Sequence, residues 1–273
     1  MDNPQEAGPH TKVESMVPMS ALTDKEFTDL VQSILVVIPH RADEGIHPGL
    51  ANHFAIWGRI GLKFATLKDP SGGYIETIRG NMEKTFLELC DIDPKVKFLV
   101  MIDNDEAVSW DAPLQLAKHD LPVVSGVICA FNSERGIFSC FLSNDAKGVP
   151  RFASDRFTDV YPGKGLKKIH SAGTGLLCIR RDVFETLVDK GEFSFMVPDH
   201  YRKEGYRAGH MKQTEDFAFC DRVRDAGFDI HVDFAVRGLH FKQIAIGLPD
   251  SKVDDDLDAN DWTVSSLDFR GIK

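Results

Sequence analysis

Two carboxylates directly follow an apolar run in the stretch Phe98–Val108, FLVMIDNDEAV. Asp103 and Asp105 stand just after this run, with Asn104 between them. Alternate side chains of an extended segment share a face, so we expect both carboxylates to point the same way and Asn104 to point away. Two like charges on one face repel unless a cation lies beside them, and oxygen ligands suit Mg²⁺ or Mn²⁺. The pattern predicts a divalent metal site able to carry a diphosphate, although Asp and Asn also simply end strands.

Two further groups could do chemistry, but spacing alone does not assign them to a site. Glu215 and Asp216 open a segment with helical spacing, where acidic residues are common and the amide dipoles favour the ionised form. His240 is flanked by apolar residues, which is typical of a hydrogen-bonded core histidine. Glu106, which follows the first acids, has no role that the sequence supports.

Strand-like and helix-like segments alternate along most of the chain. The predicted strands are Ser33–Pro39, Leu62–Leu67, Lys97–Asp103, Leu121–Phe131 and Phe228–Phe241, and the predicted helices are Pro48–Ile60, Glu76–Cys90, Asp111–His119 and Thr214–Gly227. Gly173–Leu187 is predicted to be a strand that turns into a helix capped by Asp182, and Arg135–Ser143 an antiparallel excursion. This order predicts an α/β fold with a mostly parallel central sheet flanked by helices and a small antiparallel portion.

The bulk composition limits the partners and the compartment. The chain has 273 residues and a formal net charge of −10, which argues against general binding to nucleic acid or anionic lipid. Its five cysteines are scattered, as is typical of reduced thiols in an intracellular protein. No secretory signal and no apolar stretch of about 18 residues that would span a membrane is readable, which favours the cytoplasm. Residues 1–30 are expected to form a flexible arm with one helical turn near Asp24–Leu30, and residues 246–273 an acidic tail.

Several stretches occur in the order found in one enzyme family. They are SILVVIPHR (Ser33–Arg41), ETIRGNMEKTF (Glu76–Phe86), FLVMIDNDEAV (Phe98–Val108), SAGTGLLCIRRDVFE (Ser171–Glu185) and TEDFAFCDRVRDAGFDIHVDFAVRGLHF (Thr214–Phe241). Over residues 33–242 the chain resembles the nucleotide-sugar glycosyltransferases of the GT-A fold, in particular the family-2-like group. The resemblance implies a Rossmann-like catalytic domain over residues 31–245, with a nucleotide-binding half (31–131) and an acceptor-side half (132–245) that holds the antiparallel portion.

The resemblance also implies roles for particular residues. Asp105 would ligate the metal directly, Asp103 would contact the ribose or ligate through water, and His240 would complete the site, with Mn²⁺ or Mg²⁺ as the ion. Asp216, with Glu215 beside it, matches the position of the general base in inverting members. The residues implied to contact the nucleotide-sugar donor are Pro39, His40, Arg41, Arg79, Asp103, Asn104, Gly173 and Gly175.

The implied function is transfer of one sugar from a nucleoside-diphosphate sugar, with UDP favoured, to an acceptor hydroxyl. The Glu–Asp pair favours inversion, while retention stays open. The basic segment His200–Lys212 favours an anionic acceptor, such as a phosphorylated glycan or lipid or a modified nucleic acid, with a plain solvated loop as the alternative. Two other functions stay open: a sugar-nucleotide pyrophosphorylase, whose Gly-rich loop is not matched by His40–Asp43, and a non-catalytic glycan-binding or nucleotide-binding protein.

Overall fold

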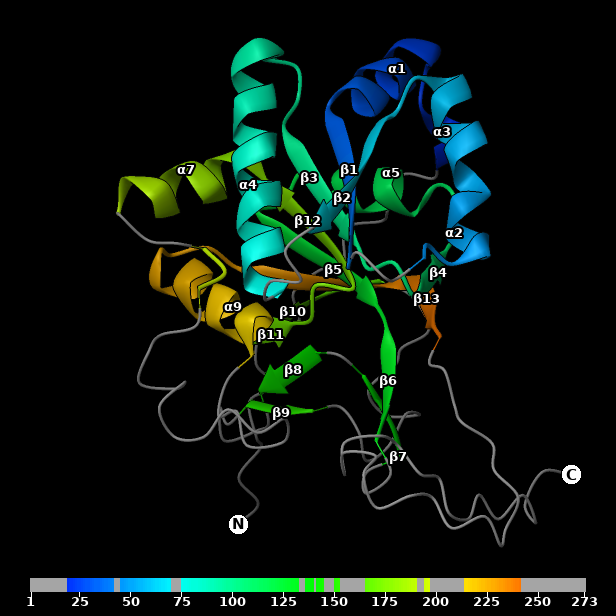
Figure 1. Ribbon diagram of the computed structural model, residues 1–273. Helices are drawn as coiled ribbons and strands as arrows, with labels where there is room; N and C mark the ends of the chain where they lie inside the picture. Colours follow the sequence, from blue (N-terminus) through cyan, green and yellow to red (C-terminus); the bar gives the residue numbers. More distant parts are fainter. Residues whose placement is uncertain are drawn as a thin grey trace, which may run out of the picture.

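The computed structural model describes residues 19–41, 45–69, 75–132, 136–139, 141–144, 150–152, 165–190, 194–196 and 214–241, and the fold is stated for these (Figure 1). The helices are a short 3-10 helix (Met19–Ala21), α1 (Asp24–Gln32), α2 (Pro48–Ala51), α3 (His53–Ile60), α4 (Ile75–Ile92), α5 (Ala112–Ala117), α7 (Arg181–Asp189) and α9 (Glu215–Asp225). The strands are β1 (Ile34–Arg41), β2 (Lys63–Asp69), β3 (Phe98–Ile102), β4 (Glu106–Val108), β5 (Val123–Val127), β6 (Cys129–Asn132), β7 (Gly136–Ser139), β8 (Phe141–Asn144), β9 (Pro150–Phe152), β10 (Leu166–Ile169), β11 (Ser171–Ala172), β12 (Leu176–Arg180) and β13 (Ile230–His240). The basic segment His200–Lys212 and the acidic tail lie outside the described residues.

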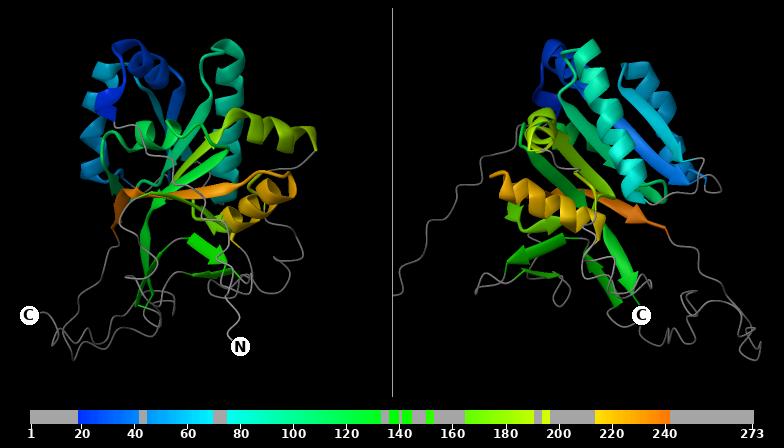
Figure 2. Two further views of the ribbon diagram at one scale, coloured as in Figure 1. Left: turned by 180° about the vertical axis from the view of Figure 1, so that it is seen from behind. Right: turned by 60° about the vertical axis from the view of Figure 1, so that its left-hand side comes forward.

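The centre of the protein is an eight-stranded sheet in the order β10-β13-β5-β12-β3-β1-β2, with β4 paired to β13 at its side. β1 is parallel to β2 and β3, and β13 is parallel to β5. β12 is antiparallel to both β3 and β5, so these two strands run the same way. Most strands therefore share one direction, and helices cover both faces (Figures 1 and 2). The predicted α/β class with a mostly parallel central sheet flanked by helices is confirmed.

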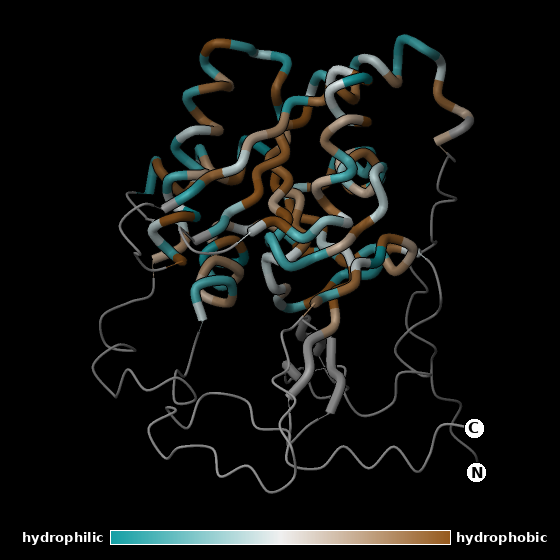
Figure 3. Tube along the Cα trace, turned by 45° about the vertical axis from the view of Figure 1, so that its right-hand side comes forward, coloured by the Kyte–Doolittle hydropathy of each residue, from teal (hydrophilic) through white to brown (hydrophobic). Residues whose placement is uncertain are grey.

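Alternate residues of the central strands face two separate hydrophobic cores. In β1, Leu35 and Val37 pack beneath α4, α7 and α9. Ile34, Val36 and Ile38 of the same strand pack beneath α1, α3 and α5. Both faces of the strand are buried, which explains why its sequence is continuously apolar and does not alternate with polar residues. In Figure 3 the central strands are largely brown, the colour of hydrophobic residues.

The helix α4 holds one flank of the sheet's carboxyl edge. Ile78, Met82 and Phe86 recur at every fourth position and are fully or almost fully buried against the sheet. Burying one such side chain contributes about 1.5–3 kcal/mol, so this face anchors the helix. The same helix turns Arg79 and Glu83 inward, and both are buried. The described helices include none with the length and apolarity needed to cross a membrane.

The predicted strand Leu121–Phe131 is two strands that belong to different sheets. β5 ends at Val127, and β6 pairs antiparallel with β7 outside the central sheet. The pairing of β5 with β13 is irregular between Asp233 and Arg237, and such bulges bend a strand and end its pairing. A second small antiparallel sheet has the order β11-β8-β9, so the predicted antiparallel portion is present as two small sheets.

Several helix boundaries also differ from the sequence prediction. The predicted helix Pro48–Ile60 is divided at Asn52 into α2 and α3. The turn predicted near Asp24 is the longer α1, because Thr23 and Glu26 form a reciprocal capping box at its start. α7 begins before Asp182, whose carboxylate pairs with Arg180 at 2.7 Å instead of capping the helix.

Candidate functional site

The chain turns sharply where β3 ends. The Glu106 amide donates to the Asp103 carbonyl at 3.1 Å, and the Asp103 amide donates to the Gly175 carbonyl at 3.0 Å. Residues 103–105 therefore form a turn, and not the extended segment that the sequence predicts. Side chains of a turn do not alternate between two faces, so Asp103 and Asp105 have different neighbours. The turn lies at the carboxyl end of a central strand, the edge where open α/β sheets bind ligands.

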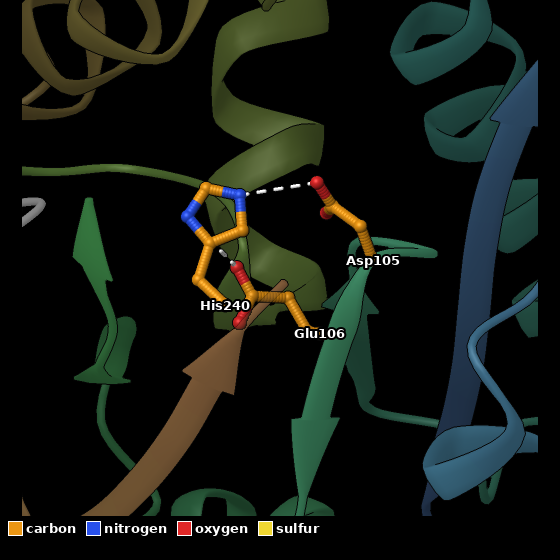
Figure 4. Close-up of side chains that lie close together, drawn as sticks. All are labelled: Asp105, Glu106 and His240. Carbon is orange, nitrogen blue, oxygen red and sulfur yellow. Dashed lines mark hydrogen bonds and ion pairs between the residues drawn. The ribbon is translucent and has the colours of Figure 1, made fainter. Parts of the chain in front are cut away.

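The far end of β13 reaches this turn. β13 pairs antiparallel with β4, which places His240 opposite Glu106, and the Phe241 amide donates to the Asp105 carbonyl at 2.9 Å. As a result His240 Nε2 lies 3.1 Å from Asp105 Oδ2, although the two residues are 135 positions apart in the sequence. Figure 4 shows the imidazole facing this carboxylate. The structure thus brings together two of the three residues implied to be metal ligands.

The second ring nitrogen of His240 faces a backbone carbonyl. His240 Nδ1 lies 3.2 Å from the carbonyl oxygen of Cys129. A carbonyl oxygen only accepts, so Nδ1 is placed to donate to Cys129, and Nε2 faces the Asp105 carboxylate, where a cation beside both could be bound. Metal-binding histidines have this arrangement, in which the other ring nitrogen donates to a backbone carbonyl or a carboxylate. The imidazole and carboxylate therefore fit a divalent cation, and the imidazole suits Mn²⁺ better than Mg²⁺.

Glu106, which the sequence left without a role, lies in the same place. It is 1% exposed, and one of its carboxylate oxygens lies 4.0 Å from His240 Nδ1. One potential ligand atom from each of Asp105, Glu106 and His240 lies within 4.8 Å of the other two. The sequence did not reveal Glu106 because β4 is only three residues long. Glu106 and Val108 are both buried, but one such alternation is too short to predict a strand.

A buried arginine holds Asp103, the remaining implied metal ligand. Arg79 is 4% exposed, and its Nη2 donates to Asp103 Oδ1 at 3.3 Å. Its Nη1 forms an ion pair with Glu215, the first residue of α9. One guanidinium thus balances two carboxylates that come from distant segments. The resemblance implies a contact between Arg79 and the donor, whereas the described contacts tie the turn after β3 to α9.

Asp216 follows Glu215 in the first turn of α9. The Thr214 hydroxyl and the Phe217 amide, the latter at 2.9 Å, both donate to Asp216 Oδ1. Burial raises the pKa of the Asp216 carboxyl above its usual value, against the lowering effect of the Arg79 guanidinium and these hydrogen bonds. The dipole of α9 favours the ionised form of the Asp216 carboxyl, but the effect of burial is larger. A raised pKa makes the carboxylate a better proton acceptor.

The other residues implied to contact the donor lie on elements at the same edge. The Asn104 amide group donates to the Gly45 carbonyl at 2.9 Å, and the Asn104 carbonyl accepts from the His47 amide at 2.8 Å. These bonds tie the loop after β1 to the turn. A Cβ on Gly175 would lie 2.9 Å from a Glu106 carboxylate oxygen, so the glycine leaves room for that side chain. Pro39, His40 and Arg41 form the end of β1, and Gly173 precedes β12.

A second buried carboxyl lies one turn along α4 from Arg79. The Ser194 hydroxyl donates to Glu83 Oε1 at 2.7 Å, and Arg222 of α9 donates to the Ser194 carbonyl at 3.3 Å. Burial raises the pKa of Glu83 to about 7, although Ser194 and Arg222 both lower it. The Glu83 carboxyl therefore titrates near neutral pH at the contact between α4, α9 and residues 194–196.

Replacing Glu83 by glutamine should remove part of the pH dependence of stability. A carboxyl whose pKa rises from 4.5 to about 7 on folding loses its proton first in the unfolded state. The free energy of unfolding therefore falls as the pH rises between these values, by about 3 kcal/mol at most. Glutamine keeps an oxygen that accepts from Ser194 but does not ionise. Urea unfolding should show E83Q about 3 kcal/mol more stable than wild type at pH 8 and equally stable at pH 4.5.

The matched control for this prediction is Glu88→Gln on the same helix, where the side chain is 64% exposed. E88Q should follow the wild-type pH profile. Parallel pH profiles for E83Q and wild type would contradict the assignment of this titration to Glu83.

No family model matches the chain, and no curated protein sequence matches it significantly. Among solved structures, A197 from STIV is similar with a TM-score of 0.47 and 14% identity, over 77% of this chain and 86% of that one. GalNAc-T7, crystallised with UDP, GalNAc and Mn²⁺, is similar with a TM-score of 0.44 and 10% identity over 81% of this chain, which spans only 46% of that protein. A nucleoside-diphosphate-sugar pyrophosphorylase from Vibrio cholerae RC9 has a TM-score of 0.34 and 12% identity, over 76% of this chain and 75% of that one. Likenesses of this size assign no activity to the chain.

Proposed function

We propose that this protein is a metal-dependent glycosyltransferase that moves one sugar from a nucleoside-diphosphate sugar to an acceptor hydroxyl. The observation that carries the proposal is the convergence of Asp105 and His240 at the carboxyl edge of the sheet, 3.1 Å apart. The sequence resemblance of this turn, of α9 and of the end of β13 to the GT-A enzymes supports the same reading. UDP as the nucleotide, inversion at the anomeric carbon and an anionic acceptor are parts of this proposal.

The metal fits the residues present. Asp105 supplies a carboxylate oxygen, and His240 supplies a ring nitrogen whose partner nitrogen is hydrogen-bonded to the Cys129 carbonyl. A divalent cation bound there would offset the negative charge that develops on the departing nucleoside diphosphate. Asn104, tied to the loop after β1, keeps the end of that strand beside the turn.

Asp216 is proposed as the general base. The acceptor oxygen forms a bond to the anomeric carbon while the bond from that carbon to the diphosphate breaks, and the electron pair of that bond leaves with the diphosphate. The hydroxyl proton passes to the Asp216 carboxylate, whose pKa is raised by burial. Thr214 and Phe217 donate hydrogen bonds to Oδ1, which fixes the position of this carboxylate.

A panel of nucleotide sugars tests the proposal directly. Purified full-length protein is incubated with each donor and Mn²⁺, Mg²⁺ or EDTA, and slow hydrolysis is scored as free nucleoside diphosphate. We expect release from at least one UDP-sugar, dependent on the cation and lost in Asp105→Ala. Asp91→Ala, at an exposed position paired with Arg181, should behave as wild type.

Two results would count against a glycosyltransferase. The first is that no donor is bound or hydrolysed with any cation. The second is that the protein releases nucleoside triphosphate and sugar phosphate when pyrophosphate is added to the donor, which would favour the pyrophosphorylase alternative.

A further inference from the structure

Asp103, the first acid of the turn after β3, contacts Arg79 and not His240. Asp103 Oδ1 accepts from Arg79, which is buried and also holds Glu215. The positive charge that offsets Asp103 is therefore a guanidinium, and this interaction points the carboxylate toward α4 and α9. Asp103 is absent from the group of side chains whose ligand atoms come together at His240.

Glu106 takes the place that Asp103 leaves. The antiparallel pairing of β4 with β13 places Glu106 opposite His240. The hydrogen bond from the Phe241 amide to the Asp105 carbonyl extends this pairing by one residue. The potential ligand atoms of Asp105, Glu106 and His240 all lie within 4.8 Å of one another. Ligands of a Mg²⁺-sized ion, with bonds of about 2.1 Å, stand about 3.0 Å apart when adjacent and about 4.2 Å apart when opposite, so the three ligand atoms must draw closer when the ion binds.

The absence of a side chain at Gly175 leaves room for the Glu106 carboxylate in this position. A Cβ at this position would lie 2.9 Å from Glu106 Oε1, closer than real Cβ contacts, but at an ordinary 3.7 Å from Asp103 Oδ2. Any side chain here would displace Glu106 and leave Asp103 nearly where it is. The carbonyl of Gly175 also accepts a hydrogen bond from the Asp103 amide, so the backbone of this glycine helps to fix the turn.

We propose that the divalent cation is held by Asp105, Glu106 and His240, and that Asp103 serves instead as a positioning residue that links the turn to α9 through Arg79. This proposal deepens the function above and rests on it for the presence of a metal. One imidazole and two carboxylates suit Mn²⁺ better than Mg²⁺, because an imidazole is a poor Mg²⁺ ligand.

Metal binding in the absence of any sugar distinguishes the two acids. Mn²⁺ is titrated into the full-length protein, and free Mn²⁺ is followed by its electron paramagnetic resonance signal. Glu106→Gln should raise the Kd at least tenfold, and Asp103→Asn should change it less than threefold. Gly175→Ala leaves every ligand in the chain but displaces the Glu106 carboxylate, so it should weaken Mn²⁺ binding as E106Q does.

Thermal unfolding of each variant without metal shows whether it is folded, and Gly175→Ala gives a second route if E106Q is not. Loss of Mn²⁺ binding in D103N with retention in E106Q would overturn the proposal, as would a wild-type protein that does not bind Mn²⁺. If the predicted binding pattern is found but no donor is hydrolysed, the ligand assignment stands and the glycosyltransferase proposal fails.

Discussion

Asp216→Asn should lower the kcat of sugar transfer by about 10²–10⁴-fold while donor binding stays unchanged. Asparagine keeps the Oδ1 acceptor that Thr214 and Phe217 bond, so the start of α9 is preserved. The asparagine amide cannot take up the proton of the acceptor hydroxyl. Initial rates with the best donor from the panel, together with a Kd for that donor from calorimetry, measure the two quantities separately.

The matched control for this variant is Asp225→Asn, an exposed acid at the other end of the same helix. It should have wild-type kinetics. Turnover by D216N within tenfold of wild type would remove Asp216 as the base. A fall in donor affinity with unchanged kcat would instead place this residue in donor binding.

The raised pKa of Asp216 adds a pH dependence to the same experiment. Because burial keeps the proton on this carboxyl to a higher pH than for an exposed aspartate, activity should be lost on acidification at a higher pH than usual. The sign follows from the base being active only when ionised. D216N should show no such acid limb in its residual rate.

Arg79→Met should lower the free energy of unfolding by about 3–5 kcal/mol, the largest stability effect we expect from one substitution. The guanidinium is 4% exposed and balances Asp103 and Glu215, so its loss leaves two carboxylates without their described cation. Methionine fills a similar volume, which keeps the cavity small. Urea unfolding at pH 7 measures the change.

Two companion variants separate charge from packing. Arg79→Lys keeps the charge but not the planar fork that reaches both acids, so its effect should be intermediate. Glu215→Gln in the Arg79→Met background should recover part of the lost stability. Arg59→Met, at an exposed position in α3, is the control and should change stability by less than about 0.5 kcal/mol. A change of under about 1 kcal/mol in R79M would contradict a role for this arginine in holding the two acids.

Arg79 also affects Asp216. After burial, which raises the pKa, the Arg79 guanidinium is the strongest lowering influence on this carboxyl. If R79M is folded enough to assay, its acid limb should therefore lie at a higher pH than that of wild type. A purely structural role for Arg79 would lower the amount of active protein and leave the position of this limb unchanged.

Patterns that depend on neighbouring residues predicted the elements well. The apolar run Ser33–Pro39 corresponds to β1, and the helical spacing of Glu76–Cys90 corresponds to α4, with bounds that differ by two residues or fewer. Both signals arise because each element buries its apolar side chains with its own period. The prediction of one strand over Leu121–Phe131 was wrong for a non-local reason. The irregular pairing of β5 with β13 ends the strand at a position that its own sequence does not mark.

The sequence by itself determined the α/β class, the order of the elements and the segments that carry acids and His240 to one edge, because hydrophobic period and turn residues act locally. Only the tertiary structure decided how those acids are shared. The turn at residues 103–105 brings Asp103 into contact with Arg79. The register of β4 with β13 places Glu106 beside Asp105 and His240. Burial, which spacing does not encode, raises the pKa of Asp216 against the field of its own helix. These outcomes depend on contacts between residues far apart in the chain and on the loss of water around them.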